Sequence, residues 1–250
     1  FYFKEVNLKK IIKDLFEFFN LDISIYPANK SIRNRIKIIT QFNINLILDI
    51  GANIGQYALL NRRLGYHGRI ISFEPMSKEY NLLKKRAISD SLWEIKNFGV
   101  GHKDTEAVIN ISKNSVSSSI HEMKPKHIEA AKNSEYISQE NIIIKKVDSF
   151  INKYVSDVDN IFMKIDTQGN EYNVIRGANK SLNKISGIQM ELSINPLYKN
   201  EKNHIELIKI LSERGFTLFS IEPGFSENTT GQLLQYDGIF IRKNLINKSQ

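Results

Sequence analysis

The stretch Leu46-Ile-Leu-Asp-Ile-Gly-Ala-Asn-Ile-Gly55, followed by Ile70-Ile-Ser-Phe-Glu-Pro75, decides the fold of this chain. Each part begins as a short apolar run typical of a buried strand, and each reaches an acid, Asp49 in the first and Glu74 in the second. A glycine turn after the first strand opens a helical pattern. This arrangement is typical of a doubly wound α/β sheet, which binds nucleotides at the carboxyl ends of neighbouring strands.

The glycine turn indicates which kind of nucleotide is bound. A dinucleotide loop has the pattern G-x-G-x-x-G, because its second glycine lets the backbone approach the pyrophosphate. Here Asn53 stands where that second glycine would be, between Gly51 and Gly55. The pattern therefore favours a ligand without phosphates, and S-adenosylmethionine is the obvious one. We expect Asp49 to meet the ammonium of its amino-acid end and Glu74 to accept both ribose hydroxyls.

The composition is ordinary for a soluble globular protein, with 41% hydrophobic and 25% charged residues among 250. Cysteine is absent, which excludes disulfides and thiolate chemistry and suits a cytoplasmic location. No apolar run reaches the ~18 residues of a membrane span. The net charge of +8 comes from scattered basic residues, so we expect no nucleic-acid partner.

Strands and helices alternate from residue 44 onward, which predicts a parallel sheet with helices on both faces. The strands are expected at 46–50, 70–73, 94–98, 142–147, 161–165, 188–193, 216–221 and 237–242, and the helices at 54–64, 77–88, 170–182 and 203–214. The catalytic domain would span residues 44–245. Before it, helical periodicity at 4–19 and 31–42 predicts that residues 1–43 form a cap over the sheet or a surface for homo-oligomer formation.

The periodicity weakens between about residues 101 and 140, and the polar, small stretch Ser112–Ser119 is typical of a loop. Long loops in compact domains are usually functional or disordered. This loop is expected either on the substrate side of the sheet, with Ser118 and Ser119 as substrate contacts, or as a mobile surface excursion.

A second strand, acid and glycine turn follows in Ile161-Phe-Met-Lys-Ile-Asp-Thr-Gln-Gly-Asn-Glu171, where Lys164 is expected to lean out of the strand. Methyl transfer to a hydroxyl needs a base near the acceptor oxygen. Asp166 is the first candidate, and the others are Glu171, Glu191 and His121. Glu171 could instead cap the helix that it opens.

No histidine spacing fits a zinc site, although the clustered carboxylates could hold a loosely bound Mg²⁺.

Taken together, these blocks resemble the FkbM family of S-adenosylmethionine-dependent methyltransferases. The resemblance covers nearly the whole chain and rests on Leu48–Tyr57, Gly68–Pro75, Ser117–Ile120, Met163–Glu171, Ile188–Ser193 and Tyr236–Arg242. It implies a seven-stranded Rossmann-like sheet with the last strand antiparallel. It also implies O-methylation of a sugar, a glycan or glycolipid precursor, or a secondary metabolite, commonly in bacterial surface-glycan synthesis.

The resemblance also assigns residues. The methyl donor would be bound by Asp49, Gly51, Asn53, Gly55, Tyr57, Glu74, Pro75, Gly99 and Asp166. Gln168 would lie on the substrate side, where family patterns often have Glu, so that a base at this position is missing here.

Three alternatives stay open. Asn195-Pro-Leu-Tyr198 resembles the Asn-Pro-Pro-Tyr motif of amino-methyltransferases that act on nucleic acid or protein, but it follows the fifth core strand instead of the fourth. A dehydrogenase is disfavoured by Asn53. A non-catalytic protein could keep the fold and use the serine loop to hold a glycan or a partner protein.

Overall fold

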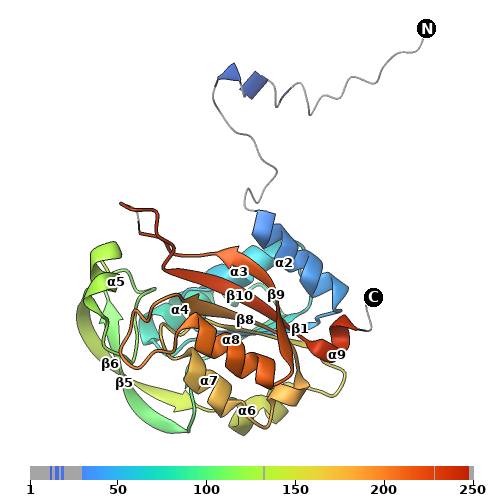
Figure 1. Cartoon of the computed structure of the whole chain (residues 1–250). Coiled ribbons are helices and arrows are strands. Elements are labelled where there is room, and N and C mark those ends of the chain that lie inside the picture. The colour runs from blue at the N-terminus through green and yellow to red at the C-terminus, as the bar shows by residue number, and fades with distance from the viewer. Residues whose placement is uncertain are drawn as a thin grey trace.

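The computed structural model describes residues 12, 15, 16, 18, 19, 30–131, 133–227 and 229–247. Most of the helix expected at 4–19 therefore lies outside the described residues. From Lys30 onward, the described chain forms a sheet between two layers of helices, with a smaller sheet beside it (Figure 1). Within this described part, no helix combines the length and the apolar character that a membrane crossing requires.

The main sheet has seven strands in the order β3-β2-β1-β7-β8-β10-β9. β10 runs antiparallel to both of its neighbours, and the other pairs are parallel. This confirms the predicted seven-stranded sheet with an antiparallel last strand. The strand bounds are β1 (Leu46–Ile50), β2 (Arg69–Phe73), β3 (Trp93–Lys96), β7 (Ile161–Ile165), β8 (Ile185–Ser193), β9 (Phe216–Pro223) and β10 (Gln235–Arg242).

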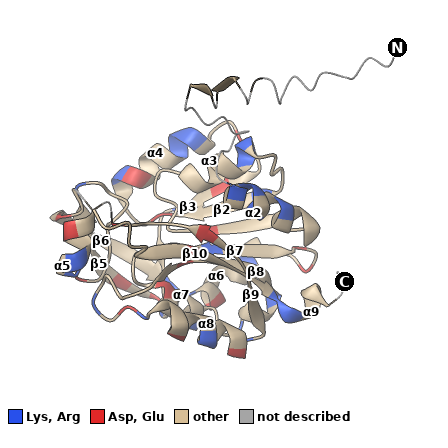
Figure 2. Ribbon diagram, turned by 45° about the horizontal axis from the view of Figure 1, so that its top comes forward, with Lys and Arg blue, Asp and Glu red and all other residues tan. Residues whose placement is uncertain are grey.

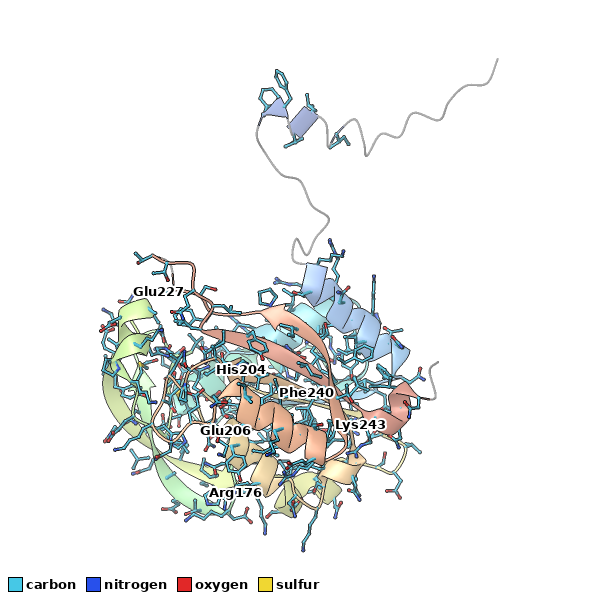
Figure 3. All side chains as sticks on the ribbon, in the orientation of Figure 1. Arg176, His204, Glu206, Glu227, Phe240 and Lys243 are labelled. Carbon is cyan, nitrogen blue, oxygen red and sulfur yellow. The ribbon has the colours of Figure 1, made fainter. Side chains whose placement is uncertain are left out.

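Helices cover both faces of the sheet, as predicted (Figure 2). One face carries α2 (Lys30–Gln41), α3 (Gln56–Arg63) and α4 (Ser77–Ala87), and the other carries α6 (Val147–Tyr154), α7 (Glu171–Gly177) and α8 (His204–Glu213). Side chains alternate between faces along a strand. In β1, Leu48 therefore packs in the α6–α8 core and Ile47 in the α2–α4 core. In β10, Phe240 belongs to the α6–α8 core, close to α8 (Figure 3).

Helix α2 confirms the helix expected at 31–42, and it packs directly on the sheet. Ile38, Ile39 and Phe42 share one buried cluster with Ile47 of β1 and Phe162 of β7. These contacts make α2 part of the same core as the sheet. The domain boundary expected at 43/44 stays a prediction.

The loop expected at Ser112–Ser119 is present, since residues 113–118 follow β5 without regular structure. The rest of the weakly periodic region 101–140 contains a sheet that the sequence did not predict. This region belongs to a small sheet of order β4-β6-β5, built from β4 (Gly99–Val100), β5 (Thr105–Ser112) and β6 (Tyr136–Lys145), with α5 (Pro125–Ala130) between β5 and β6. The strand expected at 142–147 is the end of β6 and is absent from the main sheet. The signal was weak because Val100, Ile109, Ile142 and Ile144 are the only apolar side chains of these strands that are buried. Its outer face mixes apolar and polar residues.

Two short elements remain, one before β8 and one after β10. They are η1 (Leu182–Lys184) and α9 (Lys243–Ile246).

Candidate functional site

A pocket of about 350 Å³ opens at the carboxyl ends of β2, β1 and β7. It is lined by most of the predicted site residues, namely Gly51, Asn53, Tyr57, Glu74, Pro75, Gly99, Ser118, Ser119, Asp166 and Gln168. Its lining does not include Asp49, Gly55, Glu171, Glu191 or His121. Val100, Ile109, Ile120, Ile142 and Ile144 give it an apolar wall on the side of the small sheet.

The turn after β1 shows why Asn53 can replace a glycine. Gly51 has φ +75, and a Cβ there would lie 1.9 Å from the carbonyl oxygen of Asp166, so only glycine fits. Asn53 has φ 48, a left-handed conformation that Asn tolerates better than most residues. Its Nδ2 donates to Oγ of Ser115 at 3.3 Å. The turn therefore keeps its shape while Asn53 ties it to the serine loop.

Glu74 lies in the pocket wall just after β2, as predicted. One carboxylate oxygen accepts the Asn53 N–H at 2.8 Å and the other accepts the Met76 N–H at 2.9 Å. Only 2% of Glu74 is exposed. Burial raises its pKa to about 8, although the two amide hydrogen bonds pull in the opposite direction. Each oxygen keeps a second lone pair that can accept from a ligand hydroxyl.

Asp49 lies under the pocket instead of lining it. The parallel register places it beside Ser72 of β2 and Lys164 of β7. Its Oδ2 accepts from the Ser72 hydroxyl at 2.9 Å, and its Oδ1 lies 3.5 Å from Lys164 Nζ. Burial raises the pKa of Asp49 despite the nearby Lys164. Asp49 Oδ1 has no hydrogen-bond partner within the protein, and its expected contact with a ligand ammonium stays a prediction.

Lys164 points into the α2–α4 face and is buried, so the expectation that it leans out is wrong. Its Nζ lies 3.3 Å from Asp166 Oδ2 as well as 3.5 Å from Asp49, and it donates to the Gly51 carbonyl at 3.0 Å. Burial alone would lower its pKa, but the surrounding carboxylates outweigh burial and raise it. Lys164 therefore fixes the turn after β1 to the acid after β7.

Gln168 connects the acids on the substrate side of the pocket. Its Nε2 donates to Asp166 at 2.9 Å and to Glu191 at 2.8 Å, and its Oε1 accepts from the Tyr198 hydroxyl at 2.7 Å. The serine loop reaches the same residue, because Ser119 Oγ donates to the Gln168 carbonyl at 2.6 Å. An amide with two N–H groups can bridge two carboxylates that would otherwise repel each other.

The candidate bases differ in access to the pocket. The Asp166 side chain is 38% exposed and lines the pocket. Glu191 ends in the Gln168 network, where burial and the charge of Asp166 raise its pKa well above its ordinary value. Glu171 Oε1 accepts the N–H groups of Thr167 and Gly169, at 2.8 and 3.3 Å. These bonds hold the turn before α7, and the helix itself has no side-chain cap, so capping by Glu171 stays a prediction. Burial raises the pKa of Glu171 to about 7.

His121 follows the serine loop, and its ring does not reach the pocket lining. Its backbone N–H donates to Ser119 Oγ at 3.0 Å, and its buried Nε2 has no hydrogen-bond partner. Burial lowers the pKa of His121.

Gly55 has a structural role, since a Cβ there would lie 2.8 Å from side-chain atoms of Leu83 and Trp93.

The pocket also contains residues that the sequence did not identify, namely Arg35, Lys164, Gln189 and Asp237. Lys164 and Gln189 are polar residues inside apolar strands, and the strand register places Lys164 beside Asp49 and Gln189 beside Lys164. Asp237 pairs with Glu191 across β10 and β8, and burial raises its pKa to about 6. Arg35 sits on α2 without any motif. Among the described residues, no group of three or more His, Asp or Glu could hold a metal ion.

Comparison with known proteins identifies the family of this chain. A family model described as "Methyltransferase FkbM domain" matches residues 49–218, more than half of the chain. No curated protein sequence matches at a significant level.

Three solved structures illustrate the likeness. A putative methyltransferase from Thermobifida fusca has 10% identity and a TM-score of 0.48, covering 86% of this chain and 79% of that one. A putative RNA methyltransferase from Pyrococcus horikoshii has 11% identity and a TM-score of 0.45, with 84% and 81% covered. Fibrillarin from Aeropyrum pernix, solved with natively bound S-adenosyl-L-methionine, has 11% identity and a TM-score of 0.45, with 79% and 66% covered.

Proposed function

The chain belongs to the FkbM methyltransferase family, and from this premise we propose that it transfers a methyl group from S-adenosylmethionine to a hydroxyl of a sugar, a glycan or glycolipid precursor, or a secondary metabolite. The observation that carries the donor assignment is Glu74, a buried carboxylate in the pocket wall after β2 with a free lone pair on each oxygen. A pair of vicinal ribose hydroxyls fits such a carboxylate.

The pocket suits the rest of the donor. When bound, S-adenosylmethionine supplies a methyl group on a positively charged sulfur. The apolar wall around Val100, Ile142 and Ile144 matches a flat adenine ring. The turn at Gly51 leaves the backbone bare beside Asp166, since no side chain fits there. Glu74 and this turn would hold the donor so that its methyl group faces the substrate side.

Asp166 is our candidate for the catalytic base. It lines the pocket, and Lys164 and Gln168 fix its two oxygens from either side. It would accept the hydroxyl proton as the acceptor oxygen bonds to the methyl carbon and the carbon–sulfur bond breaks. The proton then passes to solvent through the exposed part of the side chain. Holding the two reactants at attack distance can itself lower the barrier by ~7–11 kcal/mol.

A hydroxyl-bearing acceptor is supported by the chemistry of the substrate side. Ser115, Ser118, Ser119 and Gln168 line this part of the pocket, and hydroxyl and amide groups are suitable partners for sugar hydroxyls. The segment Asn195–Tyr198 does not form such a wall. Asn195 is exposed outside the pocket lining and Tyr198 is buried against Gln168, which gives no support to amino-group methylation by this motif. We also propose that the protein is cytoplasmic.

Calorimetry tests the donor assignment. We expect S-adenosylmethionine to bind the wild-type protein and Glu74→Ala to weaken binding by roughly 10- to 100-fold, because hydrogen bonds to a charged group contribute ~1.5–3 kcal/mol. Asp49→Ala should also weaken binding, through the loss of the Lys164 support. Glu94→Ala, at a half-buried acid on β3 outside the pocket lining, is the matched control. Unchanged affinity in both site variants would remove the donor assignment.

Methyl transfer assays test the acceptor class. Glycan extract, DNA and RNA are offered separately with labelled donor, and surface glycans from strains with and without the protein are compared by mass. Incorporation into glycan, and the loss of one methyl mass without the protein, would support the proposal. Transfer to nucleic acid alone would overturn it. Donor binding without transfer to any acceptor would favour the non-catalytic alternative.

A further inference from the structure

Arg35 is a buried arginine whose hydrogen-bonding capacity is only partly used. It lies on α2, is 3% exposed and lines the pocket. Its Nη1 donates to Gln189 Oε1 at 3.4 Å and lies 3.5 Å from Glu222 Oε2. Its Nε and Nη2 have no hydrogen-bond partner. Unpaired buried donors are costly, so such a pair of nitrogens beside a pocket calls for a ligand.

Another partly buried arginine of the same protein shows the usual arrangement. Arg62 uses Nε for Asp90 at 2.7 Å, Nη1 for the carbonyls of Tyr66 and Gly68, and Nη2 for the carbonyl of Leu92. Every nitrogen of Arg62 is satisfied within the protein. Arg35 differs from Arg62 in that two of its nitrogens have no partner, and Arg35 lines the pocket.

The two free nitrogens define the chemistry of the ligand. Nε and Nη2 form one edge of the planar guanidinium, with two N–H groups in the fork geometry that matches a carboxylate. Nη1, on the other edge, is already engaged with Gln189 and Glu222. A single oxygen acceptor would leave one donor unpaired, whereas a carboxylate satisfies both.

The position of Arg35 relates it to the donor end of the pocket. Its guanidinium carbon lies 4.6 Å from the centre of the Tyr57 ring, and Lys164 Nζ lies 5.5 Å from the same ring. Lys164 also donates to the carbonyl of Gly51, in the turn after β1. The pocket thus runs along the strand ends from Glu74 after β2, past Gly51 after β1, toward Arg35 of α2. Neighbouring strands of the sheet are ~4.8 Å apart.

The charges around Arg35 favour a ligand group that carries both signs. Asp237 lines the same part of the pocket, and Glu222 Oε1 is a buried acceptor without a partner. An amino-acid end, with its ammonium and carboxylate, offers one group to each sign. A simple anion would be repelled by Asp237.

We propose that the Nε–Nη2 edge of Arg35 binds the α-carboxylate of the methyl donor through two parallel hydrogen bonds. The inference rests on the proposed function, because it takes S-adenosylmethionine as the donor. It assigns to α2, which precedes the matched family region, a direct part in donor recognition.

Calorimetry with S-adenosylmethionine and with its decarboxylated analogue tests this assignment. The analogue lacks only the carboxylate, so the wild-type protein should prefer S-adenosylmethionine by roughly 10- to 100-fold. Arg35→Lys keeps the positive charge but lacks the two parallel N–H groups of a guanidinium edge. Arg35→Gln removes both the charge and this edge. Both variants should lose most of this preference while their affinity for the analogue stays within a few-fold of the wild-type value. Arg62→Lys is the control and should keep the preference.

The outcomes separate the two proposals. If the wild-type protein binds neither compound, the proposed function fails. If it binds both equally, or if the Arg35 variants keep the full preference, the role of Arg35 is overturned and the proposed function stands. An Arg35 variant that binds the analogue is folded, so its loss of preference reports on the carboxylate. Should neither variant fold, absence of the wild-type preference overturns the inference, and its presence supports recognition of the carboxylate.

Discussion

Replacing Glu74 with Gln should change how the stability of the ligand-free protein depends on pH. Burial raises the pKa of Glu74 to about 8, from an ordinary value of 4.5. The folded state then binds the proton more tightly than the unfolded chain does. The resulting stability is fully present below the unfolded pKa and is lost as pH rises through the folded pKa. One pKa unit corresponds to ~1.4 kcal/mol, so ionisation of Glu74 should remove roughly 3–4 kcal/mol from the free energy of unfolding between about pH 5 and about pH 8.

The Gln side chain has its own cost, which does not depend on pH. Both oxygens of Glu74 accept backbone N–H groups, from Asn53 and Met76. The NH₂ group of Gln cannot accept, so one of these N–H groups loses its partner at a cost of ~1–3 kcal/mol. Glu74→Gln should therefore be less stable than the wild type at about pH 5 and more stable at about pH 8, and the two stability curves should cross.

Urea unfolding of the ligand-free proteins measures this difference. Trp93 is the only tryptophan and is 5% exposed, with its Nε1 donating to Ser72 in the core, so its fluorescence reports on unfolding. The other buried acids are present in both proteins and cancel in the difference. Glu94→Gln, at a half-buried acid whose ion pairs lower its pKa, should run parallel to the wild type between about pH 5 and about pH 8, because Glu94 stays charged over this range. Parallel curves for Glu74→Gln would refute the reasoning that burial dominates the titration of Glu74.

Three further substitutions test the network that joins Lys164, Asp166 and Gln168. Lys164→Met should cost ~3–5 kcal/mol of unfolding free energy because it leaves Asp49 buried without a counter-charge; adding Asp49→Asn should recover much of this in urea unfolding, and no recovery would argue against the pairing. Asp166→Asn should lower kcat by ~10²–10⁴-fold with donor affinity within a few-fold by calorimetry, whereas normal turnover would move the base to another acid. Gln168→Glu replaces the amide bridge by a third carboxylate, so its stability relative to the wild type should be lower at about pH 8 than at about pH 5; an equal difference at both pH values would contradict this.

Much of the fold could be predicted from local sequence patterns. The apolar runs at β1 and β7 and the glycine turn at Gly51 are local signals, and they located both strands and the carboxyl edge correctly. Glu74 was placed in the pocket wall for the same reason, since it follows a buried strand directly. The small sheet was missed because its strands bury few apolar side chains, so that residues 101–140 lack a clear period.

The roles of the acids depended on which strands become neighbours. Asp49 and Lys164 each interrupt an apolar strand, but only the β1–β7 register puts them side by side and turns Asp49 into a support under the pocket.

By itself, then, the sequence determined the doubly wound sheet, the glycine turn that suits a ligand without phosphates, and the acid after β2. Each of these follows from residues that are close together in the chain. Only the tertiary structure decided that Gln168 bridges two carboxylates and that Arg35 of α2 reaches the pocket. The Gln168–Glu191 contact and the approach of Arg35 to the pocket join residues that are far apart in the chain. Such pairings are set by packing and strand register, which no local pattern records.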